Sequence, residues 1–138
     1  MAEFVMKDMV KKAGVEKYFH IESAATTDEE IGNPVYPNTK RKLAEHGISC
    51  DGKTARQMTR ADYAKFDMII GMDDENLHDM RRICGGDPDA KISLLLDHTD
   101  HPRDVADPWY TRNFDATWED VNEGCKAVLE KCRRDGFA

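Results

Sequence analysis

Cys50 and Arg56 stand at a spacing that could serve phosphoryl chemistry. Five residues separate them within "SCDGKTARQM", residues 49–58. Such a loop can bring a thiolate and a guanidinium to one phosphoryl group, the first as nucleophile and the second as a bidentate ligand of its oxygens. Only one glycine, Gly52, lies between them, whereas a phosphate cradle needs convergent backbone N–H groups that lead into a helix. The pair by itself is a weak pattern.

A second group of residues, the run Asp107-Pro108-Trp109-Tyr110, combines a carboxylate with two aromatic rings. A carboxylic acid can protonate a leaving group, and aromatic side chains can hold a phenol ring. Asp before Pro is also common in turns, so the run alone is equally consistent with a structural role. It lies in an irregular stretch, residues 97–115, and loops longer than about 15 residues in compact domains are usually functional.

Histidine and aspartate side chains also gather in this stretch, and such side chains can ligate a metal ion. The residues are His98 and His101 with Asp97, Asp100 and Asp104. No apolar framework in the surrounding sequence would hold them in place, which favours a solvated acidic loop. We therefore expect no metal site and no cofactor.

The composition fits a single domain over residues 1–138. The formal net charge of −7, from 20 basic and 27 acidic residues, argues against a nucleic-acid partner. No apolar run is long enough to span a membrane, and no signal-peptide pattern is present. The four cysteines form no C-x-x-C pair, which is typical of free thiols in a reducing cytosol. We expect a cytoplasmic protein that is a monomer or a weak dimer. The cysteines are Cys50, Cys84, Cys125 and Cys132.

Helices and strands that alternate along the chain must position these side chains. The apolar periodicity predicts helices over residues 1–14, 36–47, 74–86 and 117–132, and strands over residues 17–25, 66–72 and 90–96. Gly47 and Gly85 are stop signals, and Thr117 is the predicted cap of the last helix. This alternation indicates an α/β fold with a parallel sheet. No capping residue precedes the first helix, although an α/β chain normally enters such a helix through a strand and a tight turn.

Five stretches resemble the low molecular weight protein tyrosine phosphatase family, in the family's order and over nearly all of the chain. They are MAEFVMKDMV, IESAAT, NTKRKLAEHGI, TARQMTRADYAKFDMIIGMDDENL and DPWYTRNFDATWEDV. The resemblance implies a three-layer, doubly wound parallel sheet. It also implies that a strand and a C-x5-R-S-P loop precede the segment matched by residues 1–3, with that strand between residues 19–24 and 66–71. We therefore expect an N-terminally truncated domain whose first strand is absent from this chain.

The resemblance implies hydrolysis of phosphotyrosine proteins or aryl phosphates through a cysteinyl-phosphate intermediate. Asp107 matches the general acid, and Trp109 and Tyr110 match the aromatic wall of the pocket. Ser23 matches a serine that supports the catalytic loop through hydrogen bonds, although a hydroxyl at the end of a strand is an equal alternative.

Two further acidic residues match family positions to which the resemblance assigns no catalytic role. Asp73 matches an acidic position that is structural rather than catalytic. Glu29 lies near a position that is often aromatic at the rim of the pocket, so the substrate preference of this chain stays open.

None of the residues matches the nucleophile and phosphate-binding arginine of the family. Arg56 is followed by Gln57 instead of serine and falls in an ordinary connecting segment, so we interpret the Cys50–Arg56 spacing as a coincidence. We expect the chain as it stands to be inactive. An arsenate reductase on the same scaffold is one alternative, but it would need a redox cysteine pair and would lack the Asp-Pro-aromatic motif. A non-catalytic phosphatase-like binding protein is the other.

Overall fold

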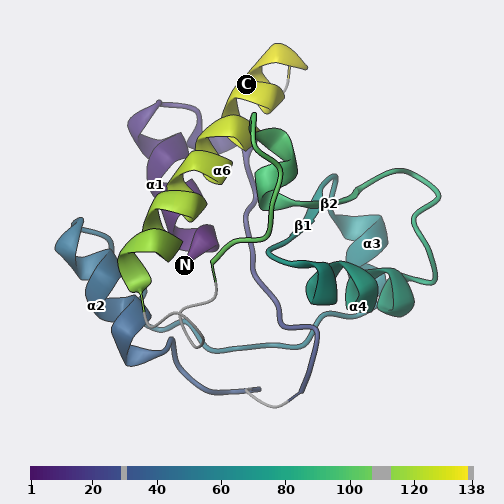
Figure 1. Ribbon diagram of the computed structural model, residues 1–138, viewed down its shortest axis with the longest axis horizontal. Coiled ribbons are helices and arrows are strands. Elements are labelled where there is room, and N and C mark those ends of the chain that lie inside the picture. Colours follow the sequence, from purple (N-terminus) through teal and green to yellow (C-terminus); the bar gives the residue numbers. More distant parts are fainter. Residues whose placement is uncertain (29–30, 107–112, 137–138) are drawn as a thin grey trace.

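The computed structural model describes residues 1–28, 31–106 and 113–136, and it shows helices on both sides of a short parallel sheet (Figure 1). The predicted α/β class is confirmed. In chain order the elements are α1 (Ala2–Lys12), η1 (Glu16–Tyr18), α2 (Pro37–Glu45), α3 (Ala61–Lys65), β1 (Ile69–Gly71), α4 (Asp74–Cys84), β2 (Ile92–Leu94), η2 (Leu95–His98) and α6 (Phe114–Arg134).

The sheet separates two apolar clusters. β1 and β2 run parallel, with Ile69 opposite Ile92. Both side chains enter a cluster with Met80 of α4, whereas Ile70 packs against the larger cluster formed with α1 and α6. Successive side chains of a strand point to opposite faces. The sheet therefore holds α4 on one face and the α1–α6 pair on the other.

The α1–α6 layer supplies most of the larger core. Val5 of α1 and Val121 of α6 are almost fully buried, and burying a side chain of this size contributes roughly 1.5–3 kcal/mol. A Cβ atom at Gly124 would overlap the side chain of Leu95, so glycine allows α6 to approach η2. Cys125 and Cys132 are buried on the same helix, as the apolar stripe of the sequence predicts.

Local sequence signals set both ends of α4. Asp73 caps its first turn by accepting a hydrogen bond from the backbone N–H of Asn76 at 2.8 Å. Gly85 ends the helix with a φ of 73°, a left-handed conformation that glycine adopts without a Cβ clash. Both observations agree with the structural interpretation of Asp73 and with the predicted glycine stop.

The last helix begins earlier than predicted. Asn113 caps it by accepting from the backbone N–H of Ala116 at 3.1 Å, so the prediction of Thr117 as the cap is wrong. Thr117 is buried inside the helix instead, and its hydroxyl donates to the backbone oxygen of Ala106 at 2.7 Å. The short helix α3 has no counterpart among the predicted elements, because five residues are too few to display a periodic apolar stripe.

The predicted strand over residues 17–25 does not form. The structure places η1 at its start, and residues 19–24 have no strand pairing; a single bridge joins Ala25 to Gln57. A strand needs a neighbour for its backbone groups, and among the described residues β1 pairs with β2 alone. The predicted strand over residues 90–96 is likewise shortened, because the chain turns into η2 at Leu95.

A polypeptide of residues 1–138 alone should be unstable or should associate through the edge of β1 that is left without a partner strand among the described residues. The strand expected between residues 19–24 and β1 would add up to roughly ten hydrogen bonds at about 1 kcal/mol each, comparable with the stability of a whole domain, about 5–15 kcal/mol. Thermal unfolding combined with size-exclusion chromatography tests this prediction.

The control is a fusion in which a strand and a C-x5-R-S-P loop of the family precede Met1, hereafter the loop fusion. It should be monomeric and should melt cooperatively. A cooperative, monomeric melt of the shorter polypeptide above about 50 °C would contradict the prediction.

Candidate active site

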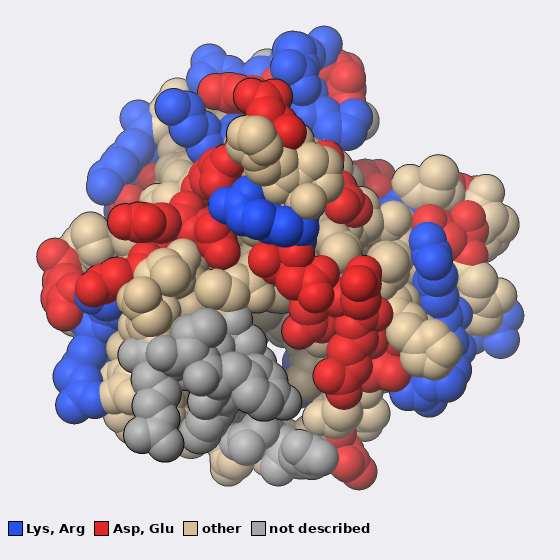
Figure 2. All heavy atoms as spheres, in the orientation of Figure 1, with Lys and Arg blue, Asp and Glu red and all other residues tan. Residues whose placement is uncertain are grey.

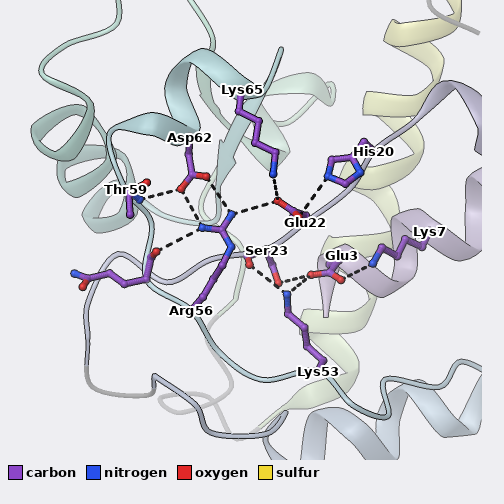
Figure 3. Close-up of polar contacts among 11 residues, drawn as sticks. Glu3, Lys7, His20, Glu22, Ser23, Lys53, Arg56, Thr59, Asp62 and Lys65 are labelled. Atoms are coloured by element: carbon purple, nitrogen blue, oxygen red, sulfur yellow. Dashed lines mark hydrogen bonds and ion pairs between the residues drawn. The ribbon is translucent and has the colours of Figure 1, made fainter.

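Glu3, in the first turn of α1, is a buried carboxylate on which three segments meet (Figure 3). Its side chain is only 4% exposed. One oxygen, Oε2, accepts from Lys7 Nζ at 2.7 Å. The other, Oε1, accepts from the Ser23 hydroxyl at 2.6 Å and lies 2.9 Å from Lys53 Nζ. We call Glu3, Lys7, Ser23 and Lys53 the Glu3 cluster; it joins α1 to residues 19–24 and to the loop that contains Lys53.

The partners of Glu3 keep it ionised. Burial alone would raise the pKa of Glu3, but hydrogen bonds from Lys7, Ser23 and Lys53 outweigh burial and lower the pKa to about 2. A carboxylate in the first turn also interacts favourably with the positive end of the helix dipole. Removing one partner of a buried ion pair leaves a charge uncompensated, which is strongly destabilising. The cluster is therefore both tightly bound and permanently charged near neutral pH.

Ser23, predicted to support a catalytic loop, lies at the N-terminal end of α1. Its hydroxyl donates to Glu3, and its backbone oxygen accepts from Lys53 Nζ at 3.3 Å. The residue is otherwise exposed. Its supporting role stays a prediction.

Arg56 binds carboxylates rather than an open anion site. Its two terminal nitrogens donate to the two oxygens of Asp62 at 3.1 and 3.2 Å, and Nη2 also lies 3.4 Å from Glu22 Oε2. The hydrogen bond that Arg56 donates to Asp62 raises the pKa of Arg56. Asp62 in turn accepts from the backbone N–H of Thr59 at 2.9 Å. The guanidinium thus ties its loop to α3.

Cys50 lies in a different environment from Arg56. It is 4% exposed and belongs to the apolar cluster that also contains Leu43 and Leu96. Arg56 is partly exposed within a group of ion pairs. A buried thiol in an apolar cluster and a guanidinium held by Asp62 do not form a phosphate cradle, which agrees with our interpretation of their spacing as a coincidence.

The chain is firmly held just before the Asp-Pro-aromatic run. The backbone N–H of Val105 donates to the oxygen of Met72, directly after β1, at 2.8 Å. The N–H of Ala106 donates to Asp120 Oδ2 at 3.1 Å, and its oxygen accepts from Thr117. Ligands of open α/β sheets bind outside the carboxyl ends of the strands, and this is the end of β1 at which Val105 is bound.

Several predicted site residues lie outside the described part of the chain. They are Asp107, Trp109, Tyr110 and Glu29. Their roles stay predictions.

His98 takes part in a local contact with β2. Its Nε2 lies 3.0 Å from the Ser93 hydroxyl, and burial lowers the pKa of His98. Asp97 accepts from the backbone N–H of Leu94 at 2.9 Å. Within residues 1–28, 31–106 and 113–136, no three His, Cys, Asp or Glu side chains gather in a way that could hold a metal ion.

Acidic side chains gather over the middle of the face shown in Figure 2, with most of the basic side chains toward its edges. Arg103 bridges two of the acids of α6, at 2.8 Å from Asp120 and 2.9 Å from Glu123. An excess of acidic charge is unfavourable for a polyanion such as nucleic acid. None of the described helices combines the length and apolar character that crossing a bilayer requires.

Glu3 and Lys53 were not singled out from the sequence, although a signal for Glu3 exists. Glu3 precedes Met6 by three residues and Val10 by seven, and all of them are buried on α1. A charged residue at an apolar-stripe position predicts a buried charge with a partner. The identity of that partner, Lys53, depends on a contact across fifty residues of sequence.

Glu3→Gln should remove much of the acid-dependent loss of stability of the loop fusion. The pKa of Glu3 in the folded chain, about 2, lies below the value of about 4.3 expected when unfolded. Its contribution is therefore complete above the unfolded pKa and is lost as the pH falls toward the folded pKa, a difference of about 3 kcal/mol. Urea unfolding at several pH values between about 7 and 2 measures this.

The wild type should lose its stability advantage over Glu3→Gln across that acidic range. Asp51→Asn serves as the control, because the Asp51 side chain is 77% exposed and has an ion pair with Lys40; it should follow the wild type. An advantage that does not change with pH would contradict the assigned pKa shift.

Comparison of the sequence with known proteins identifies the family. Residues 1–137 match the model of the family described as low molecular weight phosphotyrosine protein phosphatase. The low molecular weight protein-tyrosine-phosphatase YfkJ of Bacillus subtilis is 36% identical over 137 residues, which cover 98% of this chain and 88% of that protein.

Solved structures give the same result. The crystal structure of the Bacillus subtilis protein aligns with a TM-score of 0.93 at 35% identity and covers 98% of this chain and 86% of that one. The low molecular weight protein tyrosine phosphatase of Streptococcus pyogenes aligns with a TM-score of 0.82 at 37% identity, over 94% of this chain and 81% of that one. From its sequence and its fold, the chain belongs to the low molecular weight phosphotyrosine protein phosphatase family.

Proposed function

We propose that this chain supplies the general acid, the aromatic wall and the loop-supporting residues of a cytosolic protein tyrosine phosphatase. The reaction is hydrolysis of a phosphotyrosine protein or an aryl phosphate. The observation that carries the proposal is the family match over residues 1–137. The Glu3 cluster at the start of α1 supports it, because in this family α1 follows the catalytic loop. Four free cysteines support a reducing compartment.

Each proposed residue has a separate task. The thiolate of the family's catalytic loop attacks phosphorus, and the phenolate departs with a proton from Asp107. Water then hydrolyses the phosphocysteine, which releases phosphate and regenerates the thiolate. Trp109 and Tyr110 hold the phenol ring. The free N–H groups and the dipole at the N-terminus of α1 favour the anionic phosphoryl group.

The nucleophile and the phosphate-binding arginine do not come from the 138 residues themselves. Cys50 is buried in the core, and Arg56 is held by Asp62. We infer that a polypeptide of these residues alone does not turn over substrate, whereas the loop fusion does. Hydrolysis of an aryl phosphate by the two proteins tests this inference. An inactive but folded loop fusion would overturn the proposed function.

Asp107→Asn in the loop fusion should lower kcat by about 10²–10⁴ for phenols of high pKa, because these leaving groups need a proton. The loss should shrink for activated esters, whose phenolates depart unprotonated. Steady-state kinetics over a series of aryl phosphates provides the measurement. An equal loss across the whole series would instead make Asp107 a structural turn residue.

Cys50→Ser and Arg56→Lys should each change kcat/KM of the loop fusion by less than about threefold. Neither residue contacts substrate in the proposed mechanism. At a true bidentate phosphoryl site an Arg→Lys change is not conservative, and a serine hydroxyl does not replace a thiolate without an adjacent base. Turnover by the 138-residue polypeptide that disappears with Cys50→Ser would show that Cys50 is the nucleophile after all.

A further inference from the structure

Both backbone groups of Ala106 are bound by side chains of α6. Its N–H donates to Asp120 Oδ2 at 3.1 Å, and its oxygen accepts from the buried Thr117 hydroxyl at 2.7 Å. These two groups belong to the two planar peptide units that flank Ala106. The φ and ψ angles of a residue are the rotations between its flanking units. Thr117 and Asp120 together therefore fix both backbone torsions of Ala106.

The second of these peptide units is shared with the next residue in the chain, Asp107, to which the proposed function gives the role of general acid. The unit whose oxygen Thr117 binds also contains the backbone nitrogen of Asp107, and it is rigid from one Cα atom to the next. A restraint on the Ala106 oxygen thus acts on the backbone to which the acid's side chain is attached.

Thr117 also lies where the chain enters α6. Its hydroxyl oxygen is 3.4 Å from the backbone oxygen of Asn113, the residue that caps the helix, and its backbone N–H donates to that same oxygen. A hydroxyl has a single hydrogen to donate, and the shorter contact, to Ala106, takes it. The first turns of α6 therefore bind the chain both directly before and directly after residues 107–112.

Arg103 holds the Asp120 carboxylate in the orientation that this arrangement needs. Its Nη2 donates to Asp120 Oδ1 at 2.8 Å, while Oδ2 accepts from Ala106. The same Nη2 lies 2.9 Å from Glu123 Oε2, and Nη1 donates to the backbone oxygen of His101 at 2.8 Å. Two acids of α6 thus share one arginine, and of these two Asp120 is the one that also binds Ala106.

We propose that Thr117 and Asp120 are positioning residues, which orient the general acid Asp107 through the backbone of Ala106. The inference rests on the proposed function, because it takes Asp107 as the acid. In that step the P–O bond to the phenol breaks, the proton of the Asp107 carboxyl group passes to the phenolic oxygen, and a carboxylate remains. A general acid must lie within hydrogen-bond reach of the atom it protonates, and a displacement of about 1 Å can cost about 10²-fold in rate.

Variants of α6 in the loop fusion test the proposal. Thr117→Val removes the hydroxyl at nearly constant shape, Thr117→Ser keeps it, and Asp120→Ala removes the acceptor of the Ala106 N–H. Glu123→Ala is the matched control, because it also takes one carboxylate from Arg103 but leaves Ala106 bound. The readouts are kcat over a series of aryl phosphates, the hydrogen-exchange rate of the Ala106 N–H and the melting temperature.

We expect Thr117→Val and Asp120→Ala each to lower kcat by about 10- to 100-fold for phenols of high pKa. For activated esters the loss should stay within about threefold, since their phenolates depart without a proton. Thr117→Ser should recover most of the loss, and Glu123→Ala should stay within about threefold across the series. In an Asp107→Asn background, Thr117→Val should cost no more than about twofold.

Hydrogen exchange reads the backbone restraint without turnover. Asp120→Ala should speed exchange of the Ala106 N–H by at least about tenfold, whereas Glu123→Ala should leave it unchanged. Faster exchange with no loss of kcat for any ester would show that the contact serves the fold alone and would overturn the inference.

Two kinetic results would also overturn it while the wild-type fusion is active. One is a loss in Thr117→Val that is equal for all leaving groups, and the other is a loss that persists in full in the Asp107→Asn background. An inactive wild-type fusion that melts cooperatively is a different result, because it refutes the proposed function itself and this inference with it.

Discussion

The burial of one carboxylate constrains much of this structure. An ionised side chain removed from water costs several kcal/mol unless cations and hydrogen-bond donors replace the solvent. For Glu3 these partners come from α1 itself, from residues 19–24 and from the loop that contains Lys53. Lys7, Ser23 and Lys53 all bind the same carboxylate. Glu3 therefore fixes the first turn of α1, the segment that contains Ser23 and that loop relative to one another.

A second carboxylate, Asp62, extends the same principle toward α3. Arg56 donates to both oxygens of Asp62 and also pairs with Glu22, which in turn pairs with Lys65 (Figure 3). The loop is therefore held at Lys53 by Glu3 and at Arg56 by Asp62 and Glu22. The residue types that would suit phosphate binding here serve the fold instead. An arginine whose two terminal nitrogens already face carboxylate oxygens has its charge matched internally. The role of Arg56 thus follows from the carboxylates that the fold places beside it and not from its spacing from Cys50 in the sequence.

The apolar layers place these polar groups relative to the sheet. α1 and α6 share one cluster with Ile70, and α4 shares the other with Ile69. Because Ile70 of β1 packs against the same cluster as α1, that cluster connects the strand to the helix whose N-terminus carries Glu3. α6 also contributes directly, because Asp120 and Thr117 bind the two backbone groups of Ala106, the last described residue before Asp107.

The sequence by itself determined the α/β class, the helices α1, α2, α4 and α6, and the family, because periodic apolar stripes, glycine stops and ordered motifs are local signals. It also placed Arg56 in an ordinary connecting segment of the family. Tertiary structure decided what depends on a distant partner. Residues 19–24 did not become a strand, since pairing needs a neighbour that the described chain does not provide. Thr117 is buried within α6 and donates a hydrogen bond to the backbone oxygen of Ala106, and it does not cap the helix. The pairing of Glu3 with Ser23 and Lys53 likewise arises only when segments far apart in sequence meet, because a buried charge selects its partners in space.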